Sequence, residues 1–203
     1  MTITTKDLMG HAKTLGFLNQ HMKKIDALGI EVLDIPITEE LFHFFNTPSS
    51  LSIDPKKPKT NISWTQAILW ANKLSTLNGL SPFYKQKGQT HEFEPRMGEG
   101  YRLPTLQEYM FLVKNIEPSL KHEFAHTKEK VACTQPVATL KPSEHGLYDL
   151  LGNTWEWLWD THTSAKRYTY GGSFKDSLKV DPINTISAYR DYDNVSFRVC
   201  RTI

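Results

Sequence analysis

The sequence predicts a mixed fold in which a few helices precede a larger number of short strands. Apolar residues recur every three or four positions between Trp64 and Leu77, the spacing of an amphipathic helix. From Pro118 onward this periodicity gives way to short apolar runs separated by glycines and other turn residues, which is typical of strands and loops. We therefore expect one globular domain of helices and strands.

The composition is that of a globular protein with an apolar core. Of 203 residues, 39% are hydrophobic and 23% are charged, and 24 Lys and Arg against 22 Asp and Glu give a net charge of +2. This balance argues against a basic nucleic-acid surface, and no apolar run is long enough to span a bilayer. Residues 1–7 lack the features of a signal peptide, and two cysteines cannot form a disulfide framework. We expect a cytoplasmic or virion-associated protein that contacts neither membrane nor nucleic acid.

The first 29 residues carry one apolar stripe. Its members recur in steps of three and four, which predicts a helix that Gly29 ends. This helix either packs on its own domain or serves as a docking or oligomerisation element, while residues 30–203 form the domain proper. The stripe consists of Leu8, Ala12, Leu15, Leu18, Met22, Ile25 and Leu28.

Short elements follow in the order strand, helix, loop, helix, helix. The β-branched run after Gly29 predicts a strand, and Pro36 indicates a sheet edge. Ser and Thr residues in front of periodic apolar segments mark the starts of helices. The predicted elements are a strand over Ile30–Ile37, a short helix after Thr38, a loop over Pro48–Thr60, a helix over Trp64–Leu77 capped by Ser63, and a helix over Leu106–Lys114.

The segment of residues 145–157 contains the densest group of residues that could bind a metal ion. Asp149 and Glu156 flank a Gly-Asn turn, and oxygen ligands gathered in one tight loop are those that Ca²⁺ prefers. The residues alone leave a second interpretation open, in which Asp149 caps a turn and Glu156 lies on the surface.

Five blocks of residues occur in a specific order and extend from about Ile30 to the C-terminus. The blocks are Asn61-Ile62-Ser63-Trp64; Gly100-Tyr101-Arg102-Leu103-Pro104-Thr105 with Glu108-Tyr109; Gly146-Leu147-Tyr148-Asp149 running into Gly152-Asn153-Thr154-Trp155-Glu156-Trp157; Gly171-Gly172-Ser173-Phe174; and Phe197-Arg198-Val199. In combination they resemble the formylglycine-generating enzyme (sulfatase-modifying factor) family.

The resemblance implies a C-type-lectin-like α+β fold with little regular secondary structure. It also implies a structural Ca²⁺ held by a side-chain oxygen, two backbone carbonyls and a glutamate. In this sequence these ligands fall on Asp149, Gly152, Thr154 and Glu156.

Four residues are expected to have structural roles. Arg102 lies beside a rigid proline, and its planar guanidinium can satisfy several carbonyls or a carboxylate at once. Trp155, Trp157 and Trp159 occupy every second position of a predicted strand, so their side chains lie on one face. Such a face is more often part of the core than a ligand-binding surface. Arg198, in the last block, is the fourth residue expected to have a structural role.

The chain departs from the family at the catalytic positions. Family members that oxidise cysteine to formylglycine bind copper through two cysteines, and these positions fall on Asp176 and Asp181. A carboxylate is neither a soft ligand for Cu(I) nor a redox group. The two cysteines present, Cys133 and Cys200, lie elsewhere in the sequence. We therefore expect no copper and no oxidase activity.

The segment Thr161–Ser196 is rich in tyrosine and small polar residues, a composition typical of adaptable binding surfaces. Retroelement-diversified variable proteins use the same fold and vary the last part of the chain, which this segment resembles in composition. Alternatively, the tyrosines pack against one another in an ordinary long-loop fold. The expected ligand-binding residues are Tyr168, Tyr170, Lys175, Asp176, Tyr189, Asp191, Tyr192, Asp193 and Asn194.

These observations favour a non-catalytic binding or structural module that is stabilised by Ca²⁺ and presents residues 161–196 to a protein or glycan ligand. Such a module could be a diversified variable protein or a phage or virion adhesin, and the N-terminal helix could join copies into a homo-oligomer. The alternative is a divergent enzyme of the same family that acts on a peptide or small molecule without a copper–cysteine site.

Overall fold

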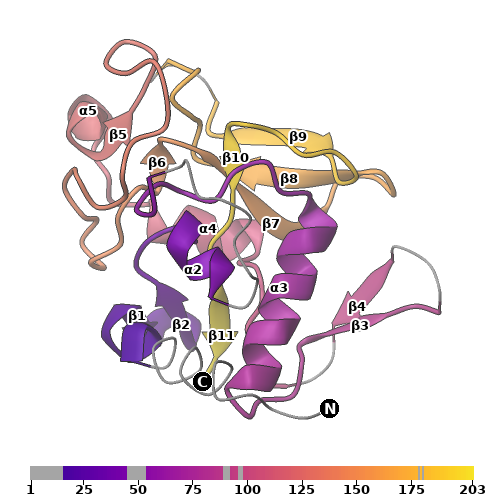
Figure 1. The fold of residues 1–203 in the computed structure, drawn as a ribbon. Helices are drawn as coiled ribbons and strands as arrows, with labels where there is room; N and C mark the ends of the chain where they lie inside the picture. Colours follow the sequence, from indigo (N-terminus) through magenta and orange to yellow (C-terminus); the bar gives the residue numbers. More distant parts are fainter. Residues whose placement is uncertain (1–15, 45–53, 89–91, 96–97, 178, 180) are drawn as a thin grey trace.

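The computed structural model describes residues 16–44, 54–88, 92–95, 98–177, 179 and 181–203. Within these residues the chain forms a three-stranded sheet, a four-stranded sheet, two two-stranded sheets and several helices (Figure 1). The predicted order, with the longer helices first and most of the short strands after them, is confirmed. No helix in this described part of the chain is long and apolar enough to cross a membrane.

The three-stranded sheet brings an early and a late segment of the chain together. Its central strand, β2 (Ile30–Leu33), pairs antiparallel with β1 (Met22–Ile25) and with β11 (Cys200–Thr202). The 3₁₀-helix η1 (Asp26–Leu28) and Gly29, with a φ of 63°, turn the chain between β1 and β2. A left-handed residue at this return favours glycine.

The predicted helix over residues 1–29 ends earlier than expected. Residues 16–21 are helical, but Met22 begins β1. Pairing with β2 satisfies the backbone of residues 22–25, so the ladder overrides a stripe that also fits a helix. Residues 1–15, which carry the first three members of the stripe, lie outside the described residues, and the docking role stays a prediction.

The predicted strand over residues 30–37 is also shorter, because β2 stops at Leu33. The chain nevertheless continues beside the C-terminal segment. The backbone N–H of Ile37 donates to the carbonyl of Phe197 at 2.8 Å. Residues after β2 therefore stay beside the residues that precede β11.

The three longest helices with described ends start at capping residues, as predicted. The side chain of Thr38 caps the first, and Ser63 and Gln66 form a capping box at the second. Thr105 and Glu108 form another capping box at the third, which ends two residues before its predicted end. These helices are α2 (Glu39–His43), α3 (Trp64–Leu77) and α4 (Leu106–Leu112).

Short elements lie along the chain between α3 and the second large sheet, two of them before α4 and the rest after it. One antiparallel and one parallel two-stranded sheet lie in this region. The elements are β3 (Tyr84–Gln86), β4 (Phe93–Pro95), η2 (Pro118–Leu120), α5 (Lys121–Phe124), β5 (Ala125–His126) and β6 (Leu151–Gly152).

The four-stranded sheet has the order β10-β7-β8-β9, with β10 parallel to β7 and the other pairs antiparallel. Two indole nitrogens tie it to the start of α3. Trp64 Nε1 donates to the Leu158 carbonyl at 2.8 Å, and Trp157 Nε1 donates to the Ile62 carbonyl at 2.9 Å. The strands are β7 (Trp155–Thr161), β8 (Lys166–Tyr170), β9 (Ile183–Ser187) and β10 (Val195–Ser196).

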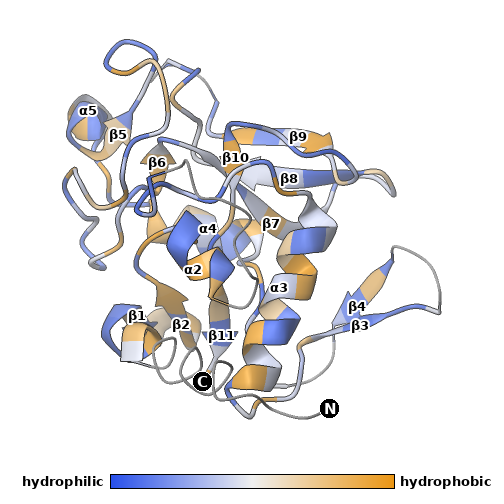
Figure 2. Ribbon diagram, in the orientation of Figure 1, coloured by the Kyte–Doolittle hydropathy of each residue, from blue (hydrophilic) through white to orange (hydrophobic). Residues whose placement is uncertain are grey.

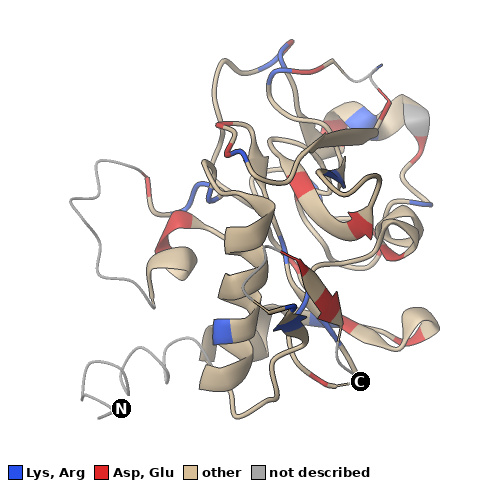
Figure 3. Cartoon of the chain, turned by 90° about the vertical axis from the view of Figure 1, so that its right-hand side faces the viewer, with Lys and Arg blue, Asp and Glu red and all other residues tan. Residues whose placement is uncertain are grey.

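The core lies on both sides of β7. Trp155 and Trp157 are buried in one apolar cluster together with residues of α3, along which hydrophobic and hydrophilic residues alternate (Figure 2). Leu158 is buried in a second cluster, and Glu156 is fully buried beside it in the sequence. Elsewhere acidic and basic residues are interspersed along the chain, and α3 carries only one charged residue, Lys73 (Figure 3).

Gly152 permits the close approach of β6 to β5. Its φ is 69°, and a Cβ there would lie 2.5 Å from the His126 carbonyl oxygen. Gly172 has a similar φ of 78° but no atom within 4 Å of such a Cβ. Both alanine variants bear the left-handed penalty of about 1–2 kcal/mol, so thermal melts should show a clearly larger loss for Gly152→Ala than for Gly172→Ala. Equal melting temperatures for the two variants would contradict this packing.

Candidate functional site

The loop that resembles a calcium site, residues 149–156, has an unusual backbone. Asp149, Gly152 and Asn153 all adopt positive φ, at 54°, 69° and 58°. The side chains of Asp149 and Glu156 are both buried. The expectation that Glu156 lies on the surface is therefore wrong.

Asp149 and Asn153 hold the segment of residues 135–138 against this loop. One carboxylate oxygen of Asp149 accepts from the Ala138 N–H at 2.8 Å, and the other accepts from Asn153 Nδ2 at 3.3 Å. The Asn153 amide in turn bonds both the N–H and the carbonyl of Gln135, at 2.9 and 3.1 Å. Burial raises the pKa of Asp149, and these donors oppose that shift in part.

Glu156 forms a buried, bidentate ion pair with Arg198. Nε and Nη2 of Arg198 each lie 2.6 Å from one oxygen of Glu156, and both side chains are shielded from solvent. Arg198 also donates to the Leu33 carbonyl at 3.2 Å and to the Tyr148 carbonyl at 2.8 Å. Burial raises the pKa of Glu156, which Arg198 opposes in part. Burial lowers the pKa of Arg198, but Glu156 more than reverses that shift.

Three of the four expected Ca²⁺ ligands, Asp149, Gly152 and Glu156, already accept hydrogen bonds from the protein. All four carboxylate oxygens of Asp149 and Glu156 accept hydrogen bonds from protein donors. The carbonyl of Gly152 accepts from the N–H of Thr154 at 2.7 Å. The two carboxylates of this loop are therefore satisfied by hydrogen bonds within the protein.

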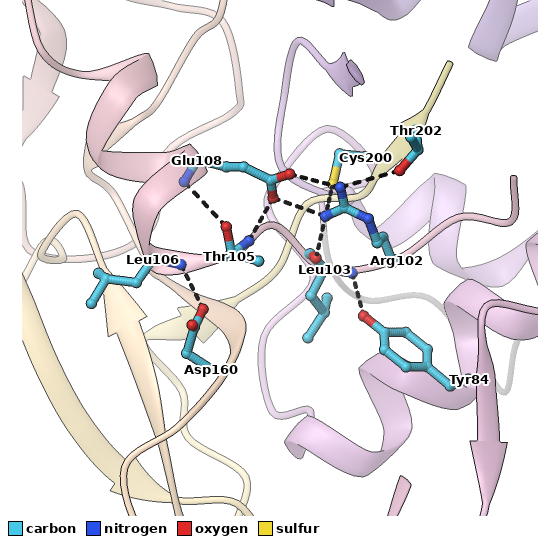
Figure 4. A network of polar contacts seen from close by, with 9 residues as sticks. All are labelled: Tyr84, Arg102, Leu103, Thr105, Leu106, Glu108, Asp160, Cys200 and Thr202. Atoms are coloured by element: carbon cyan, nitrogen blue, oxygen red, sulfur yellow. Dashed lines mark hydrogen bonds and ion pairs between the residues drawn. The ribbon is translucent and has the colours of Figure 1, made fainter. Parts of the chain in front are cut away.

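Arg102 is the centre of a second polar network (Figure 4). Its Nη1 and Nη2 bind the two oxygens of Glu108 at 2.8 and 2.7 Å, and Nη1 also lies 3.1 Å from the sulfur of Cys200. One Glu108 oxygen accepts from the Thr105 N–H at 2.7 Å, so the same carboxylate caps α4 and binds Arg102. Burial raises the pKa of Cys200 to about 12, which keeps the thiol protonated. These contacts are those that a structural role for Arg102 requires.

The positions that correspond to the copper-binding cysteines act as turn residues. Asp176 accepts from the N–H and the hydroxyl of Ser173, at 3.0 and 2.5 Å. Asp181 accepts from the Ile183 N–H at 2.9 Å. Asp176 lines a cavity of about 30 Å³, which is large enough for about one or two waters. Cys133 is exposed, whereas Cys200 is buried in the Arg102 network.

The tyrosines of residues 161–196 divide into exposed and buried members. Tyr189 is 54% exposed, and its hydroxyl donates to the Ser164 carbonyl at 3.4 Å. Tyr168 is half-buried and lies 3.1 Å from the His162 ring nitrogen. Tyr192 is half-buried and packs edge-on against Trp157.

Tyr170 is removed from the predicted binding face. It is 6% exposed and packs against Tyr109 in the second apolar cluster, with ring centroids 4.9 Å apart. Burial also raises the pKa of Tyr170. Tyr170 lies on the same face of β8 as Tyr168, but the strand is covered on both faces at its end, where Thr169 and Tyr170 are both buried.

The polar residues of the face connect two segments, 173–176 and 193–194. Lys175 Nζ lies 2.6 Å from both oxygens of Asp193. Asn194 Nδ2 donates to the Ser173 hydroxyl at 3.1 Å, which itself bonds Asp176. Asp191 is exposed and lies two residues before Asp193 in the sequence. These contacts join four of the nine predicted residues, namely Lys175, Asp176, Asp193 and Asn194.

Sequence reasoning missed Arg167. This residue is buried, with Cζ 4.3 Å from the ring centroid of Trp64, and Nη1 donates to the Thr163 and Lys166 carbonyls. Its Nε is buried with no hydrogen-bond partner in the described part of the chain. The alternation of β8, which points Arg167 opposite Tyr168, is the signal that could have identified it.

Comparisons with known proteins agree with this fold. Residues 112–203 match the family of the Sulfatase-modifying factor enzyme 1-like domain. The chaperone protein LppX of Paenibacillus barcinonensis is 23% identical over 176 residues. The aligned part covers 64% of this chain and 63% of LppX, so the chain spans less than the full length of that relative.

Three solved structures are similar over most of the chain. Treponema denticola variable protein 1 matches with a TM-score of 0.73 at 22% identity, covering 90% of this chain and 91% of its own. CarF gives 0.69 at 22% identity and 86% of each chain. PvdO from Pseudomonas aeruginosa gives 0.57 at 14% identity, covering 95% of this chain and 77% of its own. The resemblance to the formylglycine-generating enzyme family and the C-type-lectin-like α+β fold are thereby confirmed.

The Arg102 network predicts that an ammonium cannot replace the guanidinium. Arg102→Lys loses the bidentate contact to Glu108 and should destabilise the protein by about 2 kcal/mol, or about 4–8 °C in a thermal melt. Arg201→Lys is the matched control, because Arg201 pairs with Glu31 at a more exposed site. A melting temperature of Arg102→Lys equal to that of the control would mean that Arg102 acts only as a surface charge.

Proposed function

We propose that this chain, which has the fold of the formylglycine-generating enzyme family, is a non-catalytic binding module. The observation that carries the proposal is the chemistry at positions 176 and 181. Family members of the oxidase type have copper-binding cysteines there, whereas this chain has two aspartates that accept hydrogen bonds within their own turns. Because both positions are aspartates, neither supplies the thiolate that would bind Cu(I).

The binding surface of this module consists of the exposed part of residues 161–196. Its centre is the Lys175–Asp193 ion pair, with Asp191 exposed beside it in the sequence. Tyr189 is its exposed aromatic residue. Tyrosine offers a large apolar area and a hydroxyl at a low cost in side-chain entropy, which suits recognition of a protein or a glycan.

The relatives support binding rather than catalysis in a general way. One similar structure is named a variable protein, and the relative in Paenibacillus is named a chaperone protein. A variable surface on a conserved scaffold is what the proposed module would need if it were diversified or carried on a virion. Joining of copies through the N-terminal segment stays a separate prediction.

The binding role of Tyr189 can be separated from stability. We expect Tyr189→Ala to abolish capture of a ligand on glycan arrays and in cross-linked pull-downs while lowering the melting temperature little, because the side chain is half exposed. Tyr192→Ala should lower it more, since Tyr192 packs against Trp157.

The matched control is Leu69→Ala, which truncates a side chain 49% exposed on α3. Ligand retained by the control and lost by Tyr189→Ala supports the proposed surface. If Tyr189→Ala instead unfolds the protein, or binds as the control does, the tyrosine is not part of a binding surface.

The alternative function, a divergent enzyme of the family, is tested by turnover. Copper-treated protein incubated with a cysteine-containing peptide and oxygen should leave the mass of the peptide unchanged, because neither aspartate can replace a copper thiolate. A Cys133→Ser variant controls for chemistry of the exposed thiol. Oxygen-dependent turnover that survives in this variant would favour the enzyme.

A further inference from the structure

We infer that the guanidinium of Arg198 occupies the Glu156 carboxylate that the family resemblance assigns to calcium, so that the loop of residues 149–156 is held without metal. The inference concerns the scaffold and does not rest on the proposed binding surface. It follows from the partners of the two carboxylates that the family resemblance assigns to calcium.

The carboxylate of Glu156 is matched on both oxygens by Arg198. The two contacts of 2.6 Å join Nε and Nη2 to separate oxygens, and such a bidentate pair is the arrangement in which a planar guanidinium satisfies a carboxylate. A calcium ion would need the same oxygens at about 2.3–2.6 Å. It would then lie close to a fixed positive charge that is fully buried, where repulsion is screened little by solvent.

Asp149 is directed away from a metal by different donors. Its two oxygens bind the Ala138 N–H and the Asn153 amide. Asn153 is itself fixed by two bonds to Gln135. For Asp149 to coordinate an ion, this segment of residues 135–138 would lose its attachment to the loop.

Arg198 also links separate segments of the chain, as a structural ion would. It joins the carbonyls of Leu33 and Tyr148 to the carboxylate of Glu156. These groups come from the end of β2, the start of the loop and β7. A calcium ion connects loop segments by gathering oxygens, and the guanidinium does the same through its five N–H donors.

The first test measures metal and stability of the wild-type protein. After exhaustive dialysis against chelator, melting temperatures in millimolar CaCl₂ and in EDTA should agree within about 1 °C, since a ligand that binds the folded state would raise the midpoint. Elemental analysis of protein purified with calcium present should find no stoichiometric ion. One calcium per chain, or a rise of several degrees with CaCl₂, would overturn the inference.

The second test removes the guanidinium. Arg198→Gln frees both Glu156 oxygens, so its melting temperature should fall below that of the wild type and should rise again with CaCl₂. Arg102→Gln is the matched control, because it breaks an equivalent bidentate pair outside the loop. Its melting temperature should fall without any response to calcium. An Arg198→Gln protein that calcium does not restore would contradict the inference that Arg198 is the group that keeps calcium from Glu156.

Discussion

The ion pair between Arg198 and Glu156 is the interaction on which the joining of the two large sheets depends. Burying two charges costs several kcal/mol for each ion, and only close geometry with further hydrogen bonds offsets that cost. Here two short bonds and two backbone carbonyls meet the guanidinium. Loss of either partner would leave an unpaired charge in the core, which typically costs about 3–5 kcal/mol. The pair therefore fixes residue 198 between β10 and β11.

A second guanidinium fixes the same segment from the other side. Arg102 and Cys200 exchange two backbone hydrogen bonds of 2.8 Å, and the Arg102 side chain binds Glu108 at the start of α4. Arginine at both sites is explained by shape, since a planar fork binds a carboxylate and nearby acceptors at once. The C-terminal strand is thus held by two polar anchors as well as by apolar packing.

Local signals allowed much of the first half to be predicted from the sequence. Ser63 caps α3 because its hydroxyl and the Gln66 side chain satisfy donors within one turn. Residues 22–25 were not predictable, because their apolar spacing suits a helix and only pairing with β2 makes them a strand. Similarly, the role of Glu156 depends on a partner 42 residues away. No local pattern could distinguish that partner from a metal ion.

The face of residues 161–196 combines a fixed base with replaceable outer residues. Tyr170 and Arg167 are buried in β8 and contribute to packing. The outer contacts are weaker, because an exposed pair such as Lys175–Asp193 typically contributes at most about 1 kcal/mol. Substitution of these outer residues should therefore cost little stability. A scaffold held by buried arginine anchors tolerates such change, which is the property that a binding module of variable surface requires.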